Sequence, residues 1–170
     1  MKFRVFGLGK SYIVVSPENM SSMEDENFKI LSTGQYSDRY AWKAFDNNLS
    51  TWHDGRGNTP RILGYQRKDG KKNSVLSYHI YGIASSSHGD NAGHWALQGS
   101  NDGVNWDDLH VVGNDSVYTA WEGEKWHDFY LNGESGYHQY IRWCIYKNAQ
   151  GGSPEYNPYI KAFKVMGRLK

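Results

Sequence analysis

The chain has 170 residues, 38% of them hydrophobic, with 19 Lys and Arg against 18 Asp and Glu and a net charge of +1. This length and balance predict one globular domain and exclude a disordered or fibrous chain. The near-neutral charge offers no basic surplus for a phosphate backbone, so we expect no nucleic acid partner. No segment approaches the roughly 20 apolar residues of a membrane-spanning helix, so we expect no membrane span.

Aromatic residues are unusually frequent for a small domain. Seven Trp, thirteen Tyr and six Phe make up 15% of the chain, and 19 Gly imply many turns. Cys144 is the only cysteine, which excludes an internal disulfide. The composition therefore predicts a β-rich protein whose core needs only part of its aromatic rings, leaving others for a surface.

Short strand-like runs follow one another along the chain. Residues 1–27 contain two of them, 2–6 and 12–15, and then a polar, acidic stretch, so we expect a β extension or attachment segment there. Residues 28–170 form the expected main domain, with strand-like stretches at 61–65, 75–84, 94–99, 106–112, 126–131, 139–146 and 159–166. No helical periodicity is sustained, and parallel strands would need crossover helices. The pattern predicts an all-β, antiparallel sandwich or jelly roll.

The run from Tyr140 to Tyr146 shows how these strands alternate. One face carries Ile141, Trp143 and Ile145, and the other carries polar or amphipathic side chains and Cys144. We therefore expect Cys144 to be a small structural residue in a sheet. We also expect Trp143, with Trp52, Trp95 and Trp106, to lie in the core, because all four fall at strand or motif positions.

Motifs for catalysis, nucleotide binding and zinc binding are missing from the sequence. The glycines near Lys10 lack the earlier glycine of a phosphate-binding loop, and the seven histidines lack the spacing of a zinc site. Asp107 and Asp108 are adjacent, so on a strand they point to opposite faces and cannot act as an acid/base pair. No Gly-x-Ser-x-Gly segment occurs. We expect a protein that is not an enzyme.

Two segments carry a family resemblance. They are AFDNNLSTWH, from Ala44 to His53, and WALQGSNDGVNW, from Trp95 to Trp106, followed near the C-terminus by Val165-Met166-Gly167. In type, order and spacing they resemble the discoidin family (coagulation factor V/VIII C-type domains), and especially its galactose-binding-like carbohydrate-binding modules. The resemblance covers roughly residues 28–167. It implies a jelly-roll β-sandwich that binds a carbohydrate or cell-surface ligand without catalysis, with a role in host adhesion.

The same resemblance suggests which residues contact the ligand. A histidine directly after the motif tryptophan binds a sugar hydroxyl in the sugar-binding branch, and His53 matches it. Arg56 stands where that branch has a stacking aromatic ring. Two later loops complete the candidate ligand site, with His88, Asp90, Asn91 and Tyr156. Rings that cover a sugar face and polar groups that bind its hydroxyls suit this ligand. The alternative is that these are ordinary polar loops.

A calcium ion is the one cofactor that the resemblance implies. The matching metal positions are Asp46, Asn48 and Thr51, in a loop rich in the oxygen ligands that Ca²⁺ prefers. Asn47 stands where the family has glycine, and Ala162 where an acidic residue often completes the site. The alternative is a loop in which Asp and Asn side chains cap their own backbone.

A second function stays open at this stage. The N-terminus shows no secretory signal, so we expect synthesis in the cytosol and action outside the cell, or on a virion surface after lysis. The alternative function is a structural virion protein that decorates a phage capsid or tail. Its partners would then be other virion subunits, contacted through residues 1–27.

Overall fold

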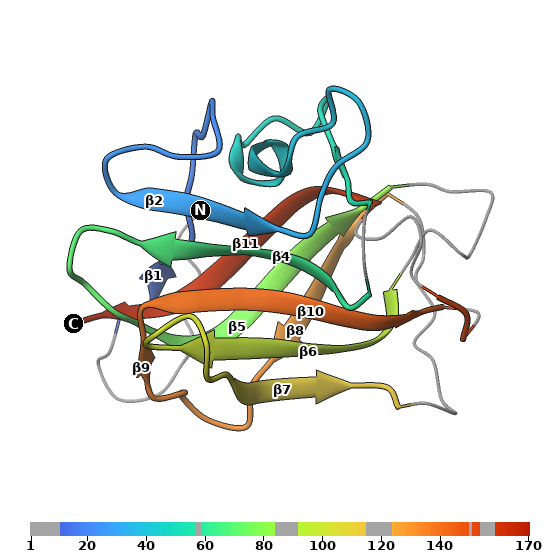
Figure 1. Ribbon diagram of the computed structural model, residues 1–170. Coiled ribbons are helices and arrows are strands. Elements are labelled where there is room, and N and C mark those ends of the chain that lie inside the picture. Colours follow the sequence, from blue (N-terminus) through green and yellow to red (C-terminus); the bar gives the residue numbers. More distant parts are fainter. Residues whose placement is uncertain (1–10, 57–58, 84–91, 115–123, 150, 154–158) are drawn as a thin grey trace.

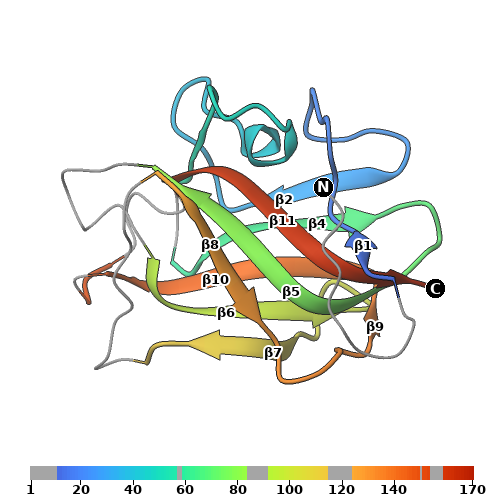
Figure 2. The same cartoon turned by 180° about the vertical axis from the view of Figure 1, so that it is seen from behind.

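Two antiparallel sheets pack face to face in the computed structural model, which describes residues 11–56, 59–83, 92–114, 124–149, 151–153 and 159–170 (Figures 1 and 2). The β5 sheet has the order β1 (Ile13–Val14), β11 (Tyr159–Leu169), β5 (Asn73–Gly82) and β8 (Trp126–Tyr130), with β3 (His53–Asp54) beside β11 and β9 (Tyr137–His138) beside β5. The β10 sheet has the order β2 (Phe28–Ser32), β4 (Arg61–Arg67), β10 (Tyr140–Asn148), β6 (Ala92–Ser100) and β7 (Asp107–Val112). The expected all-β antiparallel sandwich is confirmed.

The alternation expected for β10 accounts for the core. Ile141, Trp143 and Ile145 are buried, and Trp143 pairs in register with Leu63 on β4 and Leu97 on β6. This row packs against buried rings and branched side chains of the β5 sheet, among them Tyr78, Ile80, Phe163 and Val165. Burying each large apolar side chain contributes about 1.5–3 kcal/mol. Cys144 is also buried, and burial raises the pKa of its thiol, in keeping with a structural role.

Two of the four tryptophans expected in the core lie at its edge instead. Trp95 and Trp143 are fully buried, but Trp52 and Trp106 are only half-buried. The Arg142 guanidinium lies 3.7 Å from the centre of the Trp106 ring, which also packs edge-on to Tyr140. It follows a turn in which Gly103 has a positive φ of 74°, as the Asn-Asp-Gly run indicates. This turn places the ring outside the sheet rather than between the sheets.

Residues 11–27 are joined to the sandwich. β1 pairs with β11, the Val15 amide donates to the Val165 carbonyl at 2.9 Å, and Val15 and Met20 are buried in the common core. A Cβ at Gly167 would come within 1.8 Å of the Ser74 carbonyl oxygen, so the close approach of β11 to β5 beside β1 requires glycine there. The predicted strand 2–6 lies outside the described residues.

The one helical element described is η1, a 3-10 helix from Ala41 to Phe45. Its buried face, with Ala41, Ala44 and Phe45, packs above β11 and β2 (Figure 1). Within the part of the chain that the structure describes, no helix is long and apolar enough to cross a membrane. The role of η1 is to reverse the chain between β2 and β3, and it thereby positions the loop from Asp46 to Arg56.

Candidate functional site

One end of the sandwich gathers the segment that carries the predicted ligand residues. It is the right-hand end in Figure 1, where β5 and β10 end and β4, β6 and β11 begin. β3 pairs with the start of β11, with Tyr159 opposite Asp54 and Ile160 opposite His53. This pairing holds the residues from Trp52 to Arg56 at this end of the molecule.

His53 lies in the interior, with 0% of its surface exposed. Its Nδ1 lies 2.9 Å from the Arg39 carbonyl oxygen. A carbonyl only accepts hydrogen bonds, so Nδ1 carries the proton and Nε2 has a free lone pair in the neutral ring. Nε2 is buried and has no hydrogen-bond partner among the residues that the structure describes. Burial lowers the pKa of His53 to about 4, so the ring is neutral at physiological pH.

Arg39, whose carbonyl oxygen faces His53, also belongs to a cluster of rings and guanidinium groups. The Arg39 guanidinium donates to the Asp54 carboxylate at 2.7 Å and lies 5.2 Å from the centres of both the Tyr36 and Trp52 rings. The Arg56 guanidinium also lies over the Tyr36 ring, 3.7 Å from its centre. Tyr36 is 42% exposed, so one end of the stack reaches the surface. The arrangement offers planar rings and nitrogen donors within a few ångströms of each other.

Trp52 adds a second polar atom without a partner. Trp52 directly precedes His53 in the chain, and its indole Nε1 is buried without a hydrogen-bond acceptor in the described part of the chain. Leaving a buried polar group unpaired costs about 1–3 kcal/mol. Trp52 and His53 thus each carry one buried polar atom, a donor and an acceptor, that has no partner among the described residues.

The structure brings only part of the predicted ligand site together. His53 and Arg56 belong to the cluster just described, whereas His88, Asp90, Asn91 and Tyr156 lie outside the described residues. Sequence reasoning missed Tyr36, Arg39 and Asp54. The Tyr36 amide donates to the Asp54 carbonyl at 2.9 Å, so these residues meet only after η1 has turned the chain back on itself. No local motif signals that contact.

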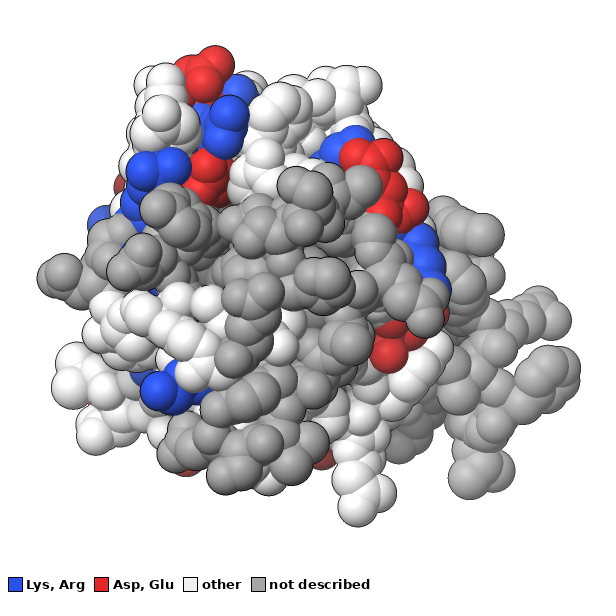
Figure 3. All heavy atoms as spheres, turned by 90° about the vertical axis from the view of Figure 1, so that its right-hand side faces the viewer, with Lys and Arg blue, Asp and Glu red and all other residues white. Residues whose placement is uncertain are grey.

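Figure 3 shows this end of the molecule as spheres. Among the described residues, Lys and Arg lie next to Asp and Glu at the upper left and upper right of the view, so neither sign of charge forms a patch of its own there.

The predicted metal loop brings three oxygen atoms together. Thr51 Oγ1 lies 2.5 Å from Asp46 Oδ2 and 2.9 Å from the Asn48 carbonyl oxygen. The loop also caps itself, because the Asn48 amide donates to Asp46 Oδ1 and the Ser50 amide to Asn48 Oδ1. Asn47 has a φ of 58°, the left-handed conformation that asparagine tolerates in place of glycine.

The loop offers one carboxylate and two neutral oxygen donors to a calcium ion. Ca²⁺ takes 6–8 oxygen ligands, and its affinity follows the number of charged ones. Asp46 supplies one carboxylate, Ala162 on β11 supplies none, and the described residues contain no cluster of three or more His, Cys, Asp or Glu. Asp46, Asn48 and Thr51 would hold the ion, which would supply charge that fixes the loop and no reaction chemistry.

Comparison with known proteins bears on the fold. No protein-family model matches the sequence, and no curated protein shows significant similarity to it. Among solved structures, the CBM62 module of Xyl5A from Clostridium thermocellum superposes with a TM-score of 0.62 at 17% identity, over 82% of this chain and 94% of that one. The chain has the fold of a carbohydrate-binding module. The family 32 module of Clostridium perfringens NanJ, solved with galactose, gives a TM-score of 0.59 at 16% identity, over 82% of this chain and 93% of its own.

A third similar structure is also a sugar complex. The module CBM32-5 of the C. perfringens protein CpGH89, in complex with GalNAc-β-1,3-galactose, has a TM-score of 0.58 and 15% identity, over 82% of this chain and 94% of that one. The resemblance to galactose-binding-like modules is thus confirmed for the fold. At these identities the binding residues must be argued from this chain's own side chains.

Proposed function

We propose that this chain is a non-catalytic carbohydrate-binding module that takes a neutral, galactose-type sugar at the end of the sandwich containing His53. The observation that carries the proposal is the buried His53 Nε2, whose lone pair has no donor. A sugar hydroxyl supplies such a donor. Similar modules in known structures hold galactose and GalNAc-β-1,3-galactose, which supports this choice of ligand.

Each residue of the cluster has a distinct part in this proposal. His53 Nε2 accepts a hydrogen bond from a sugar hydroxyl, and Trp52 Nε1 donates one to a sugar oxygen. The Arg56 guanidinium, which covers one face of the partly exposed Tyr36 ring, donates to sugar hydroxyls, and the uncovered part of the ring packs on the C–H face of the sugar. Arg39 is a positioning residue, because its carbonyl oxygen orients His53 and its guanidinium holds Asp54. Since His53 has no exposed surface, we expect binding to need a small local opening.

The ligand's source follows from the proposed chemistry. Galactose and GalNAc occur at the ends of cell-surface glycans, so we further propose that the module mediates adhesion to such a surface. The site would then recognise the terminal sugar and leave the rest of the glycan in solvent. A glycan array with terminal and internal galactose residues separates these two forms of recognition.

Calorimetry with galactose and GalNAc-β-1,3-galactose tests the proposed site. We expect the variants His53→Phe and Arg56→Ala to lose at least about tenfold in affinity, equivalent to about 1.4 kcal/mol. Arg168→Ala is the matched control, because Arg168 is also a partly buried arginine that stacks on a tyrosine, Tyr12, and pairs with Glu134. It should bind like the wild type. Absence of binding to every sugar on the array, or unchanged affinity in His53→Phe, would contradict the proposal.

A further inference from the structure

The side chains of Ser77, His79 and Asp128 form a hydrogen-bonded series on the outer face of the β5 sheet. None of the three belongs to the proposed sugar site. Ser77 and His79 are two residues apart on β5, so the strand pleat places them on the same face. Asp128 on β8 lies directly opposite His79 in register. Figure 2 shows this sheet from outside, with β8 along the edge of β5. The contact pattern is therefore a consequence of pleat and register.

The distances assign a role to each atom. His79 Nδ1 lies 2.6 Å from Asp128 Oδ1, and His79 Nε2 lies 3.1 Å from Ser77 Oγ. A carboxylate accepts, so Asp128 fixes the proton on Nδ1 and leaves the Nε2 lone pair facing the Ser77 hydroxyl. The hydroxyl then donates to Nε2. This is the order of atoms in which a histidine can remove the proton of a serine nucleophile.

The exposed fraction falls from Asp128 through His79 to Ser77. The Asp128 side chain is 50% exposed and that of His79 15%, while Ser77 is only 4% exposed. Tyr130, which lies opposite Ser77 on β8, is largely exposed and packs edge-on to His79. A reagent can therefore approach from the outer face, but the narrow access to Ser77 limits it to a small group.

We propose that Ser77 is a nucleophile, activated by His79 and positioned through Asp128, that accepts small acyl groups from esters. Ser77 Oγ forms a bond to the acyl carbon while its proton passes to His79 Nε2. The ester C–O bond then breaks, and the leaving alcohol takes the proton from His79. The products are O-acyl Ser77 and a free alcohol, with no other reactant needed.

The surrounding backbone predicts that this reaction is slow. β5 is a central strand, so its N–H groups are used in the ladders to β11 and β8. A strand in this position has no pair of N–H groups to bind the negative oxygen of a tetrahedral intermediate. One such donor is worth about 10²–10³ in rate. We therefore expect about one acyl group per chain, taken up slowly, rather than rapid ester hydrolysis.

The test uses p-nitrophenyl acetate with the full chain. Release of p-nitrophenolate gives the rate, and mass analysis of peptides locates the acetyl group. We expect acetyl on the peptide that contains Ser77, none there in Ser77→Ala, and a rate about 100-fold lower in His79→Gln, since a general base contributes about 10²–10⁴. Asp128→Asn should be slower than Asp128→Glu, which keeps the carboxylate.

Ser74 provides the matched control within the same strand. Its hydroxyl is buried and donates to the Ser135 carbonyl at 2.8 Å, with no histidine partner. Ser74→Ala should react at Ser77 like the wild type, and melting temperatures of all variants establish that each is folded. An unmodified Ser77 in the wild-type chain, or an equal rate at Ser77 in a folded His79→Gln, would overturn the proposal. This outcome is independent of whether the chain binds sugars.

Discussion

His53 is the residue on which most of the proposed site depends, and its burial makes a prediction about stability. The pKa of His53 is lowered to about 4 by burial, whereas an unfolded histidine titrates near 6.5. Between these values the unfolded chain binds a proton that the folded chain excludes. Stability should therefore fall as the pH drops from about 6.5 to about 4, by up to about 3 kcal/mol from this residue.

Urea unfolding at about pH 7 and about pH 5 checks this prediction. Burial also lowers the pKa values of His110 and His138, so the wild type alone does not isolate His53. In His53→Gln, which has no titrating ring, the loss of stability between the two pH values should be smaller by about 2 kcal/mol. An equal loss in both proteins would show that His53 is not buried in its neutral form.

Single residues also mark where prediction from the sequence was effective. His53 and Arg56 follow a recognisable motif, so their neighbourhood could be predicted. Tyr36, Arg39 and Asp54 could not, because the contact between the segment before η1 and β3 depends on two backbone hydrogen bonds formed in the fold. Ser77 and His79 stand two apart in a predicted strand. Their partner Asp128, however, is known only once β8 is placed in register with β5.

At the scale of elements, the long alternating strands were predictable, and among the short ones the run 12–15 corresponds to β1 (Ile13–Val14). Seven predicted stretches correspond to β4, β5, β6, β7, β8, β10 and β11, with ends that differ by a few residues. β2, η1, β3 and β9 were not predicted. β3 has two residues and η1 five, too few for a period to show, and their conformation follows from packing against β11.

The loop after η1 gives a prediction for calcium. One carboxylate and two further converging oxygens suit a site with a dissociation constant of about 1 mM. At about 10 mM calcium, this affinity would add about 1.4 kcal/mol to the stability, or a few degrees in melting temperature. Asp46→Asn should remove the response, while magnesium at the same concentration serves as the ion control. A melting temperature that does not respond to calcium in the wild type would leave the self-capped loop as the correct interpretation.

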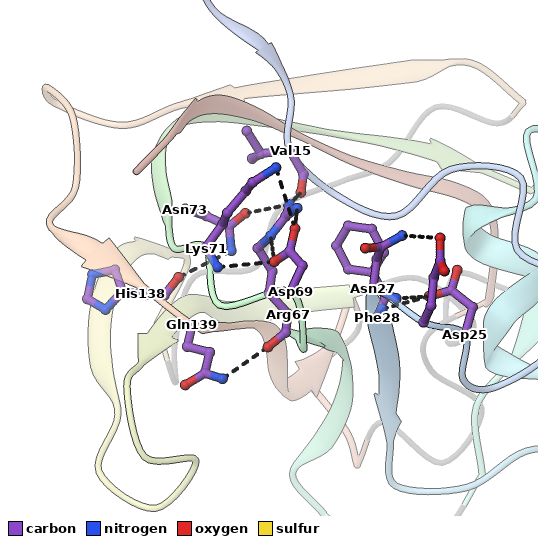
Figure 4. Close-up of polar contacts among 11 residues, drawn as sticks. Val15, Asp25, Asn27, Phe28, Arg67, Asp69, Lys71, Asn73, His138 and Gln139 are labelled. Atoms are coloured by element: carbon purple, nitrogen blue, oxygen red, sulfur yellow. Dashed lines mark hydrogen bonds and ion pairs between the residues drawn. The ribbon is translucent and has the colours of Figure 1, made fainter.

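At the scale of the whole molecule, a buried arginine joins the N-terminal segment to the sandwich (Figure 4). The Arg67 guanidinium donates to Asp69 at 2.5 and 3.0 Å and to the Val15 carbonyl oxygen at 3.1 Å, and it lies 4.6 Å from the Phe28 ring centre. The Asn73 amide continues the network to the His138 carbonyl. The composition of residues 1–27 predicts an extension or attachment segment. The contacts that join it to the sandwich could not be predicted, because long-range contacts leave no local pattern in the sequence.

This network should make residues 11–27 unfold together with the rest of the domain. Hydrogen bonds from Arg67 lower the pKa of Asp69, so the pair stabilises the fold above the ordinary carboxyl range and loses that effect as the pH falls below about 4. Asp69→Asn leaves the buried Arg67 charge without its partner and should cost about 2–3 kcal/mol near neutral pH. The difference from the wild type should narrow below about pH 4. The exposed Asp38→Asn is the control, with an expected change under about 0.5 kcal/mol.

Tryptophan fluorescence and circular dichroism should report one coincident unfolding transition, because Val15 and Met20 share the common core. Two separate transitions would instead identify the N-terminal segment as an independent unit.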